Sequence, residues 1–435
     1  MLYGLTRNIR FNFIPACMKK LIPFLFIIAY LTSNAQTAVS GSILSNTVWP
    51  LSGSPYIVSG NLVVFSGVTL TVDPGVTVKF NSGASLEVRG TLSAIGTKVD
   101  SITFTSNSLT PTKGSWGGIK AIGTTNPLGV GNQITMVFVK GLYANRFIDL
   151  DLAYHGPYVF KHSYFANNNK VNHDGGMPST TFDRCKFEFN TLGLDYCQFS
   201  SRVSNSEFIN NTDGLSGFGI VDSCYFSNNT GIALSPYGIT RGCTVVNNNI
   251  GVNCMFNGVN NTFINNNVSN NFNGVEILTY FNGSITFTNN FICNNSNYNI
   301  RLLTANNADL SGNCWCSNNA GTIASKIYDG NINTAYGLVN FTPFNTNCSI
   351  TGLNEAVLNN ASVSFYPNPF REALHVSIEN DGPSELILYD VTSKEVLKEK
   401  FIRKTNILTH QLVSGVYFYR ILNDTEVLQG KIIKN

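Results

Sequence analysis

The side chains most able to do chemistry are concentrated between residues 146 and 188. This stretch holds ten charged residues and three of the five histidines, whereas only seven charged residues occur in the 110 positions from 191 to 300. Within the stretch, His173-Asp174-Gly-Gly176 has the composition of a loop, the kind of segment in which functional residues concentrate. If the chain carries a catalytic or ligand site, we expect it here.

Five residues of this stretch are candidates for the site. Asp149 and Asp151 alternate along an extended segment, so that one face could present both carboxylates to a sugar or to a calcium ion. His162, His173 and Asp183 add groups suited to acid–base catalysis. In the alternative interpretation, the stretch is a solvated face with a loop insertion and does no chemistry.

The candidates lie in a region with a loose internal repeat. One Asn marks each repeat, at intervals of 22, 21, 18, 19, 23 and 24 residues: Asn168, Asn190, Asn211, Asn229, Asn248, Asn271 and Asn295. The residue three positions earlier is apolar each time: Phe165, Phe187, Phe208, Phe226, Val245, Val268 and Ile292. A Gly often follows two or three positions later, at Gly193, Gly214, Gly231, Gly251 and Gly274. Loose periods of this size are typical of a solenoid.

The local pattern indicates which solenoid it is. Between turn residues the segments are short, β-branched or aromatic, and alternate with period two, while no long helical periodicity occurs. We therefore predict an all-β parallel β-helix. Asn tolerates the left-handed backbone conformation of tight corners, and its side chains can bond to one another from coil to coil. The Phe column should form an apolar spine inside, so a structural role explains the Asn residues better than a binding role.

The cysteines are interpreted as structural. Ten are present, none at the spacing of a metal or Cys-x-x-Cys redox site. Ser163, Cys185, Ser206, Cys224 and Cys243 all lie five residues before a repeat Asn, so Cys224 and Cys243 should occupy adjacent coils. That separation is compatible with a disulfide, and an inward stack of free thiols is an equal alternative.

An earlier segment carries a family resemblance. Tyr56-Ile-Val-Ser-Gly60 through Thr91-Leu-Ser-Ala-Ile-Gly96, then Ile102-Thr-Phe-Thr-Ser106 and Trp116-Gly-Gly-Ile119, resembles the opening coils of pectin-lyase-like right-handed β-helix proteins. With the Asn repeats, the resemblance covers roughly residues 50–345 and implies the fold. It says little about activity, because the family includes lyases, hydrolases, adhesins and inert spacers. The Asp-Asp, Gly-His-Gly and Arg-x-Pro-x-x-Arg motifs of pectinolytic members do not occur here.

The N-terminus has the layout of a secretory signal peptide. Met18-Lys19-Lys20 precedes an apolar core of 11 residues, Leu21 to Leu31, and a small residue, Ala35, marks the expected cleavage point. We predict a signal peptide over residues 1–35, with Met18 as its true start. No other segment reaches transmembrane length, and the charged fraction of 12% without basic clusters argues against nucleic-acid binding.

After Cys348 the composition becomes charged and short strands recur, which indicates a small β-sandwich. The order of motifs closely resembles the type A C-terminal sorting domain of the type IX secretion system. The matching residues are Tyr366, Pro367, Asn368, Pro369, Phe370, Gly415, Tyr417, Lys431 and Lys434. The resemblance implies Sec export, interaction with the type IX machinery, removal of the module, and release or attachment to surface lipopolysaccharide.

We therefore expect a signal peptide (1–35), a right-handed parallel β-helix (36–348), a linker (349–360) and an Ig-like sorting domain (361–435). The preferred function is a secreted or surface protein that binds glycans or adheres without catalysis. A polysaccharide lyase or glycoside hydrolase that uses residues 146–188 is the rival, and a passive spacer is a third possibility. No cofactor is implied, although calcium could bind at Asp149 and Asp151.

Overall fold

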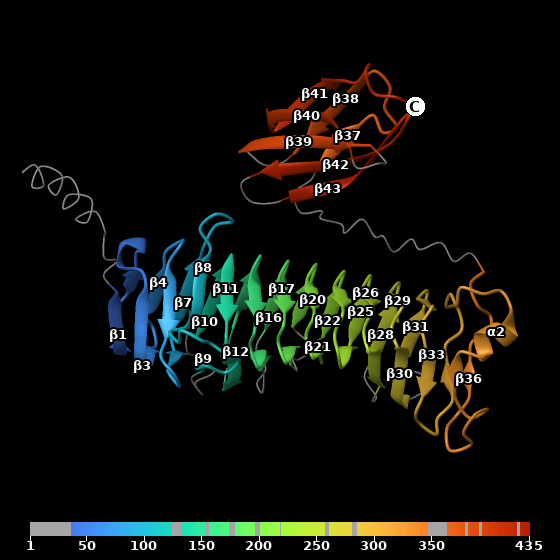
Figure 1. Cartoon of the computed structure of the whole chain (residues 1–435), viewed down its shortest axis with the longest axis horizontal. Coiled ribbons are helices and arrows are strands. Elements are labelled where there is room, and N and C mark those ends of the chain that lie inside the picture. Colours follow the sequence, from blue (N-terminus) through green and yellow to red (C-terminus); the bar gives the residue numbers. More distant parts are fainter. Residues whose placement is uncertain are drawn as a thin grey trace, which may run out of the picture.

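The computed structural model describes residues 36–435 except 124–131, 153–155, 174–178, 196–200, 218, 257–260, 281–284, 347–362, 379–381, 391–393 and 424–426. The side chains of residues 151, 152, 256, 423 and 427–431 are also outside the described set. The predicted signal peptide and the predicted linker therefore lie outside the described residues. The described residues form an elongated stack of parallel strands and, after it in the sequence, a separate antiparallel unit (Figure 1).

Along most of the stack each coil contributes one strand to each of three faces, and equivalent strands on adjacent coils pair in parallel. The first face consists of β2 (Thr47–Trp49), β4 (Thr69–Val72), β7 (Thr91–Ile95), β10 (Gln133–Val137), β13 (Tyr158–Lys161), β16 (Thr180–Asp183), β19 (Arg202–Ser204), β22 (Ile220–Asp222), β25 (Ile239–Arg241), β28 (Asn261–Ile264) and β31 (Ile285–Thr288). These 11 strands, counted over the described residues, confirm the predicted β-solenoid.

The other two faces share their first strands, β1 (Thr37–Ile43) and β3 (Tyr56–Val64). The second face continues with β5 (Thr77–Phe80), β8 (Ile102–Ser106), β11 (Val139–Leu142), β14 (Tyr164–Ala166), β17 (Lys186–Glu188), β20 (Glu207–Ile209), β23 (Tyr225–Ser227), β26 (Thr244–Val246), β29 (Asn267–Ser269) and β32 (Phe291–Cys293). The third continues with β6 (Ser85–Val88), β9 (Trp116–Ile122), β12 (Ala144–Leu152), β15 (Lys170–His173), β18 (Leu192–Leu194), β21 (Asp213–Ser216), β24 (Ile232–Ser235), β27 (Ile250–Phe256), β30 (Asn273–Tyr280), β33 (Tyr298–Leu302) and β35 (Ile327–Tyr328).

The predicted apolar spine runs inside the second face. Phe165, Phe187, Phe208 and Phe226 are fully buried. Successive rings stack with centroids 5.4, 4.5 and 4.7 Å apart. Val245, Val268 and Ile292 continue the column. Because every coil buries its apolar position against the next, the core is continuous along the stack.

At the corner between the second and third faces, two adjacent residues share the roles that we expected of the repeat Asn. One adopts the left-handed backbone conformation, and the other forms the hydrogen bonds between coils. The left-handed residue precedes the repeat Asn: Asn167, Asn210, Asn228, Asn247, Asn270 and Asn294 all have φ between 55° and 59°. The repeat Asn itself points inward and is buried. Asn190, for example, directs its backbone N–H and its amide to Oδ1 of Asn211 on the next coil, at 2.9 and 3.1 Å. Its amide also donates to the Phe165 carbonyl at 3.0 Å. The predicted ladder of Asn side chains is confirmed, one position away from the tight turn.

A second ladder lines the corner between the first and second faces. Its last members are Asn266, Asn290 and Asn313, which bond to one another as the first ladder does. Earlier coils place Ser or Cys in the same column, and Cys185 donates its N–H to the hydroxyl of Ser206 at 3.0 Å. The column predicted from the sequence comprises only its Cys and Ser members.

The recurring glycines reflect close contact between coils. A Cβ added to Gly193 would lie 2.3 Å from the Gly214 carbonyl oxygen, and one added to Gly214 would lie 2.3 Å from that of Ala233. A side chain at either position would push these coils apart, although the next coil carries Ala233 at the equivalent place. Packing and not turn conformation therefore requires glycine at positions 193 and 214.

The C-terminal end of the stack is covered by irregular structure around α2 (Ala320–Ala324), with β34 (Ala308–Asp309) paired to β36 (Val339–Asn340). Asn319 caps α2 by accepting the Thr322 N–H at 3.0 Å. Ile323 of α2 is buried against the common core. A disulfide joins Cys293 to Cys316.

The second unit is an antiparallel β-structure that fits the predicted small sandwich. Its strands follow the order β37 (Ser364–Tyr366), β38 (Ala373–Ser377), β41 (Lys404–Leu408), β40 (Glu395–Ile402), β39 (Pro383–Tyr389), β42 (Gly415–Asn423) and β43 (Val427–Lys434). Its own apolar core includes Phe370, Leu374, Leu386, Tyr417 and Ile421. We refer to residues 364–435 as the tail.

Candidate functional site

The outward surface of the third face carries a column of charged residues. The register pairs Lys120 of β9 with Asp149 of β12, and Asp149 with His173 of β15. Asp195, the residue after β18, continues the column because its carboxylate contacts His173. Since the strands are parallel and in register, these side chains project on one side at successive coil spacings of about 4.8 Å.

A parallel column of cations lies beside it. Arg146 and Lys170 are paired one coil apart, and each reaches a carboxylate of the first column. Arg146 Nη1 lies 3.3 Å from Asp149 Oδ2, and Lys170 Nζ lies 2.6 Å from Asp195 Oδ2. We call these six residues the charged cluster: Lys120, Arg146, Asp149, Lys170, His173 and Asp195.

Asp195 connects the cluster. Its Oδ2, which contacts Lys170 Nζ, also lies 3.2 Å from Nδ1 of His173. Burial raises the pKa of the Asp195 carboxyl, but its hydrogen bonds with Lys170 and His173 outweigh burial and hold that pKa below its ordinary value. Asp195 is therefore a carboxylate at neutral pH, and it fixes the orientation of the His173 ring.

The segment between β8 and β9 borders the corner next to the cluster. Lys113 in this segment reaches Thr191 Oγ1 on a later coil at 3.4 Å. Partial burial lowers the pKa of Lys113. The segment therefore extends along several coils beside Arg146 and Lys170, and adds a cation to that edge.

The structure separates the five predicted site residues. Asp149 and His173 belong to the charged cluster, whereas His162 and Asp183 lie at the corner between the first and second faces, where the His162 N–H donates to the Asp183 carbonyl at 3.0 Å. His162 stacks on Phe138, and burial lowers its pKa. The side chain of Asp151 lies outside the described set. Of the four candidates whose side chains are described, the structure brings Asp149 and His173 to the same face and places His162 and Asp183 elsewhere; a catalytic or binding role for any of them stays a prediction.

Four cluster members were missed as site residues: Lys120, Arg146, Lys170 and Asp195. The available signal was the coil period, since His173 follows Asp149 by 24 positions and Asp195 follows His173 by 22. In the described part of the chain, no three His, Cys, Asp or Glu side chains are grouped to hold a metal ion. Calcium binding at Asp149 thus stays a prediction.

The same outward column changes character on later coils. Ser216 and Ser235 pair at the equivalent position, followed by Asn253 and Glu276. Glu276 is buried, accepts a hydrogen bond from Asn273 at 2.9 Å and pairs with Arg301. Arg301 in turn lies over the Tyr328 ring, so this pair is held in place from both sides.

Most placed motif residues of the tail hold the domain together. Phe370 is fully buried, and it exchanges backbone bonds of 2.9 Å with the last strand, through Ile433 and Asn435. Asn368 Oδ1 accepts the Ile433 N–H at 2.9 Å. The Lys434 ammonium donates to the Arg371 and Thr409 carbonyls at 2.7 and 2.6 Å.

The remaining motif residues differ in their surroundings. The Tyr417 hydroxyl donates to the Val413 carbonyl at 2.6 Å, and Gly415 pairs with the end of β43. Tyr366 is 71% exposed and therefore free to meet a partner. Pro367 and Pro369 follow cis peptide bonds, and the side chain of Lys431 lies outside the described set.

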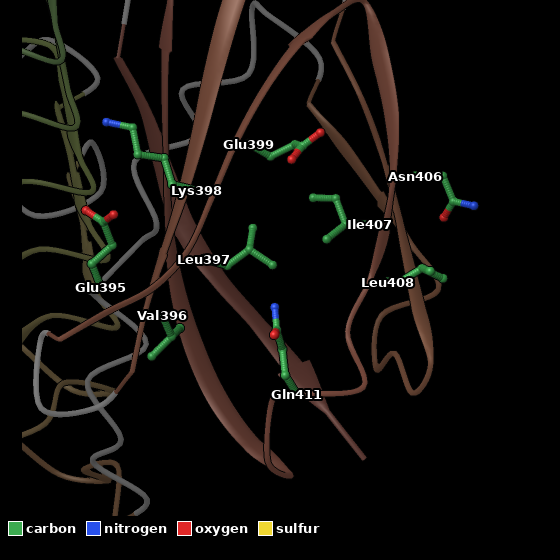
Figure 2. Close-up of a pocket in the computed structure, with 9 residues that line it drawn as sticks. All are labelled: Glu395, Val396, Leu397, Lys398, Glu399, Asn406, Ile407, Leu408 and Gln411. Atoms are coloured by element: carbon green, nitrogen blue, oxygen red, sulfur yellow. The ribbon is translucent and has the colours of Figure 1, made fainter.

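The tail also contains a cleft of about 530 Å³ between β40 and β41 (Figure 2). These strands pair only at Ile402 and Lys404 among the described residues. Leu397 and Ile407 point toward each other across the cleft, and Glu399 and Gln411 lie near its ends (Figure 2). None of the predicted catalytic residues lines it.

Two segments of the chain match known families. Residues 41–136 match the pectate-lyase like beta helix domain, and residues 364–435 match the secretion system C-terminal sorting domain. Protein bark beetle of Drosophila melanogaster is 39% identical over 80 residues, which is 18% of this chain and 3% of that protein. The chain thus matches only a small part of that relative's length.

These matches confirm the predicted combination of a pectin-lyase-like β-helix with a type IX sorting tail. The tail indicates handling by the type IX secretion machinery and export to the cell surface or the medium. No helix within the described ranges has the length and hydrophobicity to cross a bilayer.

Proposed function

We propose that the exported β-helix binds an anionic polysaccharide along the charged cluster, without cleaving it. The observation that carries the proposal is the in-register column of Lys120, Asp149 and His173 on adjacent coils. A repeating surface with one polar group per coil suits a repeating polymer, because neighbouring sugar units can make equivalent contacts on successive coils.

The balance of charge favours an anionic ligand. Three cations of the cluster face two carboxylates, and Lys113 adds a further cation at the edge. Both carboxylates are already paired with Arg146 or Lys170, whereas Lys120 is exposed and forms no ion pair among the described residues. Uronic-acid polymers are anionic because their sugar units carry carboxylates at regular intervals. The likeness of residues 41–136 to a pectate-lyase-like domain supports this class of polymer as the ligand.

The pairing of the carboxylates also supports binding over hydrolysis. Glycoside hydrolysis needs one carboxyl group as the acid and another as the base or nucleophile on opposite sides of the scissile bond. Asp149 and Asp195 are instead engaged by cations. A lyase is the second candidate, and the contact of His173 with Asp195 is what favours it, since a positioned imidazole could abstract a proton from a uronic acid.

The test measures binding of the exported protein to polygalacturonate, alginate and a neutral glucan. We expect salt-sensitive binding to the anionic polymers alone. Lys120→Ala and Lys170→Ala should each weaken it about three- to tenfold, the effect of losing a partly exposed charge contact worth roughly 0.5–1.5 kcal/mol. Lys140→Ala, an exposed cation on the second face, is the matched control and should leave affinity unchanged.

Two results would contradict the proposal. Equal affinity of the Lys120→Ala/Lys170→Ala double variant and the unmodified protein would remove the cluster from the binding surface. Cleavage of a uronic-acid polymer to unsaturated products that is lost in His173→Ala would replace the binding protein with a lyase.

A further inference from the structure

Two buried thiols lie directly above one another in the middle of the stack. β23 and β26 pair Tyr225 with Thr244, and the Thr244 N–H donates to the Cys224 carbonyl at 2.9 Å. Cys224 and Cys243, the residues just before, therefore occupy equivalent positions on adjacent coils. Both side chains are almost fully buried and neither is in a disulfide.

The two sulfur atoms share one local environment. Cys224 Sγ donates to the Asp222 carbonyl at 3.3 Å, and Cys243 Sγ donates to the Arg241 carbonyl at 3.4 Å, two residues earlier in each case. Burial raises the pKa of the Cys224 thiol, and the neighbouring Cys243 thiol raises it further. Neighbouring positions on parallel strands are about 4.8 Å apart, which lies within the range that a disulfide spans without backbone movement.

We propose that Cys224 and Cys243 become linked by an inter-coil disulfide while the exported protein folds. The Cys293–Cys316 disulfide provides an internal parallel, because it also joins consecutive coils, with Cα atoms 5.8 Å apart and a separation of 23 positions in the sequence. Cys224 and Cys243 are separated by 19 residues, the length of one coil. Export past the inner membrane brings both pairs into a compartment where disulfides persist.

The neighbouring cysteines lack a partner of this kind. Cys185 belongs to the same column, but the coils on either side place Ser163 and Ser206 at its position. Cys254 lies on the third face, and Ile277 is its neighbour on the next coil. Both are buried free thiols. The structure thus selects one pair among the four free cysteines that it describes.

The reaction is a thiol–disulfide exchange with an oxidised protein or small-molecule disulfide. The thiolate of one cysteine attacks the oxidant's disulfide, forms a mixed disulfide and releases one thiolate of the oxidant. The second cysteine then attacks the mixed disulfide and releases the other. The pair loses two electrons and two protons, and the oxidant leaves as two thiols.

Burial restricts when this can happen. Once the coils have closed, no oxidant can reach sulfur atoms that are almost fully buried, and burial raises the pKa of the Cys224 thiol well above its ordinary value. The exchange therefore takes place before the two coils stack. Afterwards the link is protected from external reductants by the same burial.

The experiment is thiol mapping of the full-length chain recovered after export. The protein is quenched in acid, denatured, alkylated with iodoacetamide before any reduction, digested and analysed by mass spectrometry. We expect alkylated Cys185 and Cys254, and a cross-linked peptide that contains Cys224 and Cys243 and is lighter by two hydrogen atoms than the two separate peptides. Alkylation of Cys224 and Cys243 to the same extent as Cys185 would overturn the proposal.

Two variants and one refolding comparison sharpen the result. Cys185→Ser should leave the cross-link intact, whereas Cys224→Ser should make Cys243 as alkylatable as Cys185. Protein made in a reducing cytoplasm should acquire the link when refolded from denaturant with oxidised glutathione, and should not acquire it when the folded protein is treated in the same way. Rapid oxidation of the folded protein would contradict the timing, and the mapping of the unmodified chain decides the link even if Cys224→Ser folds poorly.

Discussion

The β-helix and the tail distribute fold and function in opposite ways. In the β-helix, inward Phe and Asn columns hold the coils together, and the charged cluster lies on outward positions outside the apolar core. In the tail, the motif residues Asn368, Phe370 and Lys434 are themselves contacts of the fold. Substitutions on the surface of the β-helix can therefore leave its fold intact. Substitutions of these motif residues in the tail also remove contacts that hold the tail together.

The largest effect should come from removing the tail. Deletion of residues 361–435 should abolish delivery outside the cell, because the sorting domain directs the chain to the type IX machinery. Fractionation and immunoblotting should then find the protein inside the outer membrane. Normal surface or medium levels of the truncated chain would refute the role of the tail.

Within the tail, Phe370→Ala should strongly destabilise or unfold the domain. Phe370 is fully buried in a small core, and such a truncation costs about 3–5 kcal/mol. Export should fall with the loss of structure, whereas Tyr366→Ala, at an exposed motif position, should lower export with little change in tail stability. Thermal melting and export measured together distinguish the two; equal stability of both variants would contradict the structural role of Phe370.

In the β-helix, Asn211→Ala should destabilise the central coils by about 3 kcal/mol. Asn211 accepts two N–H bonds from Asn190 and donates to the Phe187 carbonyl, so its loss leaves buried polar groups unpaired. Thr212→Ala, at the exposed adjacent residue, is the matched control. A similar shift of the denaturation midpoint in both variants would show that the ladder adds little.

Substitutions in the charged cluster should have much smaller effects on stability. His173→Ala and Lys170→Ala should each change the free energy of unfolding by less than about 1 kcal/mol, because partly exposed ion pairs contribute little. Polysaccharide affinity should nevertheless fall. A loss of several kcal/mol of stability would mean that this face is structural, and would break the contrast with the tail.

The smallest effect is a pH dependence at Asp195. Its pKa is held below the ordinary value of 3.8, so the stabilisation by Lys170 and His173 is present above that value. This stabilisation should be lost as the pH falls through the lower pKa that Asp195 has in the folded state. The loss should amount to less than about 1 kcal/mol. The melting temperatures of the protein and of Asp195→Asn should approach each other as the pH falls from neutral to below 3.8; curves that stay parallel over the whole range in which the protein is folded would contradict the assignment.

Part of the site could be predicted from the sequence. The concentration of charge between residues 146 and 188 identified Asp149 and His173, which share the charged cluster. His162 and Asp183 were grouped with them but lie at another corner. The reason is that a coil contains three outward faces, so residues close in sequence can face different directions, whereas residues one coil apart face the same way.

The sequence by itself determined the repetitive part of this protein. Phe, Gly and Asn at inward or tightly packed positions recur because each coil stacks on an equivalent one, and a motif match identifies the tail. Only the tertiary structure decided that the left-handed residue precedes the ladder Asn, and that Lys120 and Asp195 join Asp149 and His173. Stacking constrains inward side chains to a repeating pattern. Outward side chains contact solvent and follow no repeating pattern, and the length of the coils varies. Which outward residues align on adjacent coils is therefore determined only by the strand register of the folded protein.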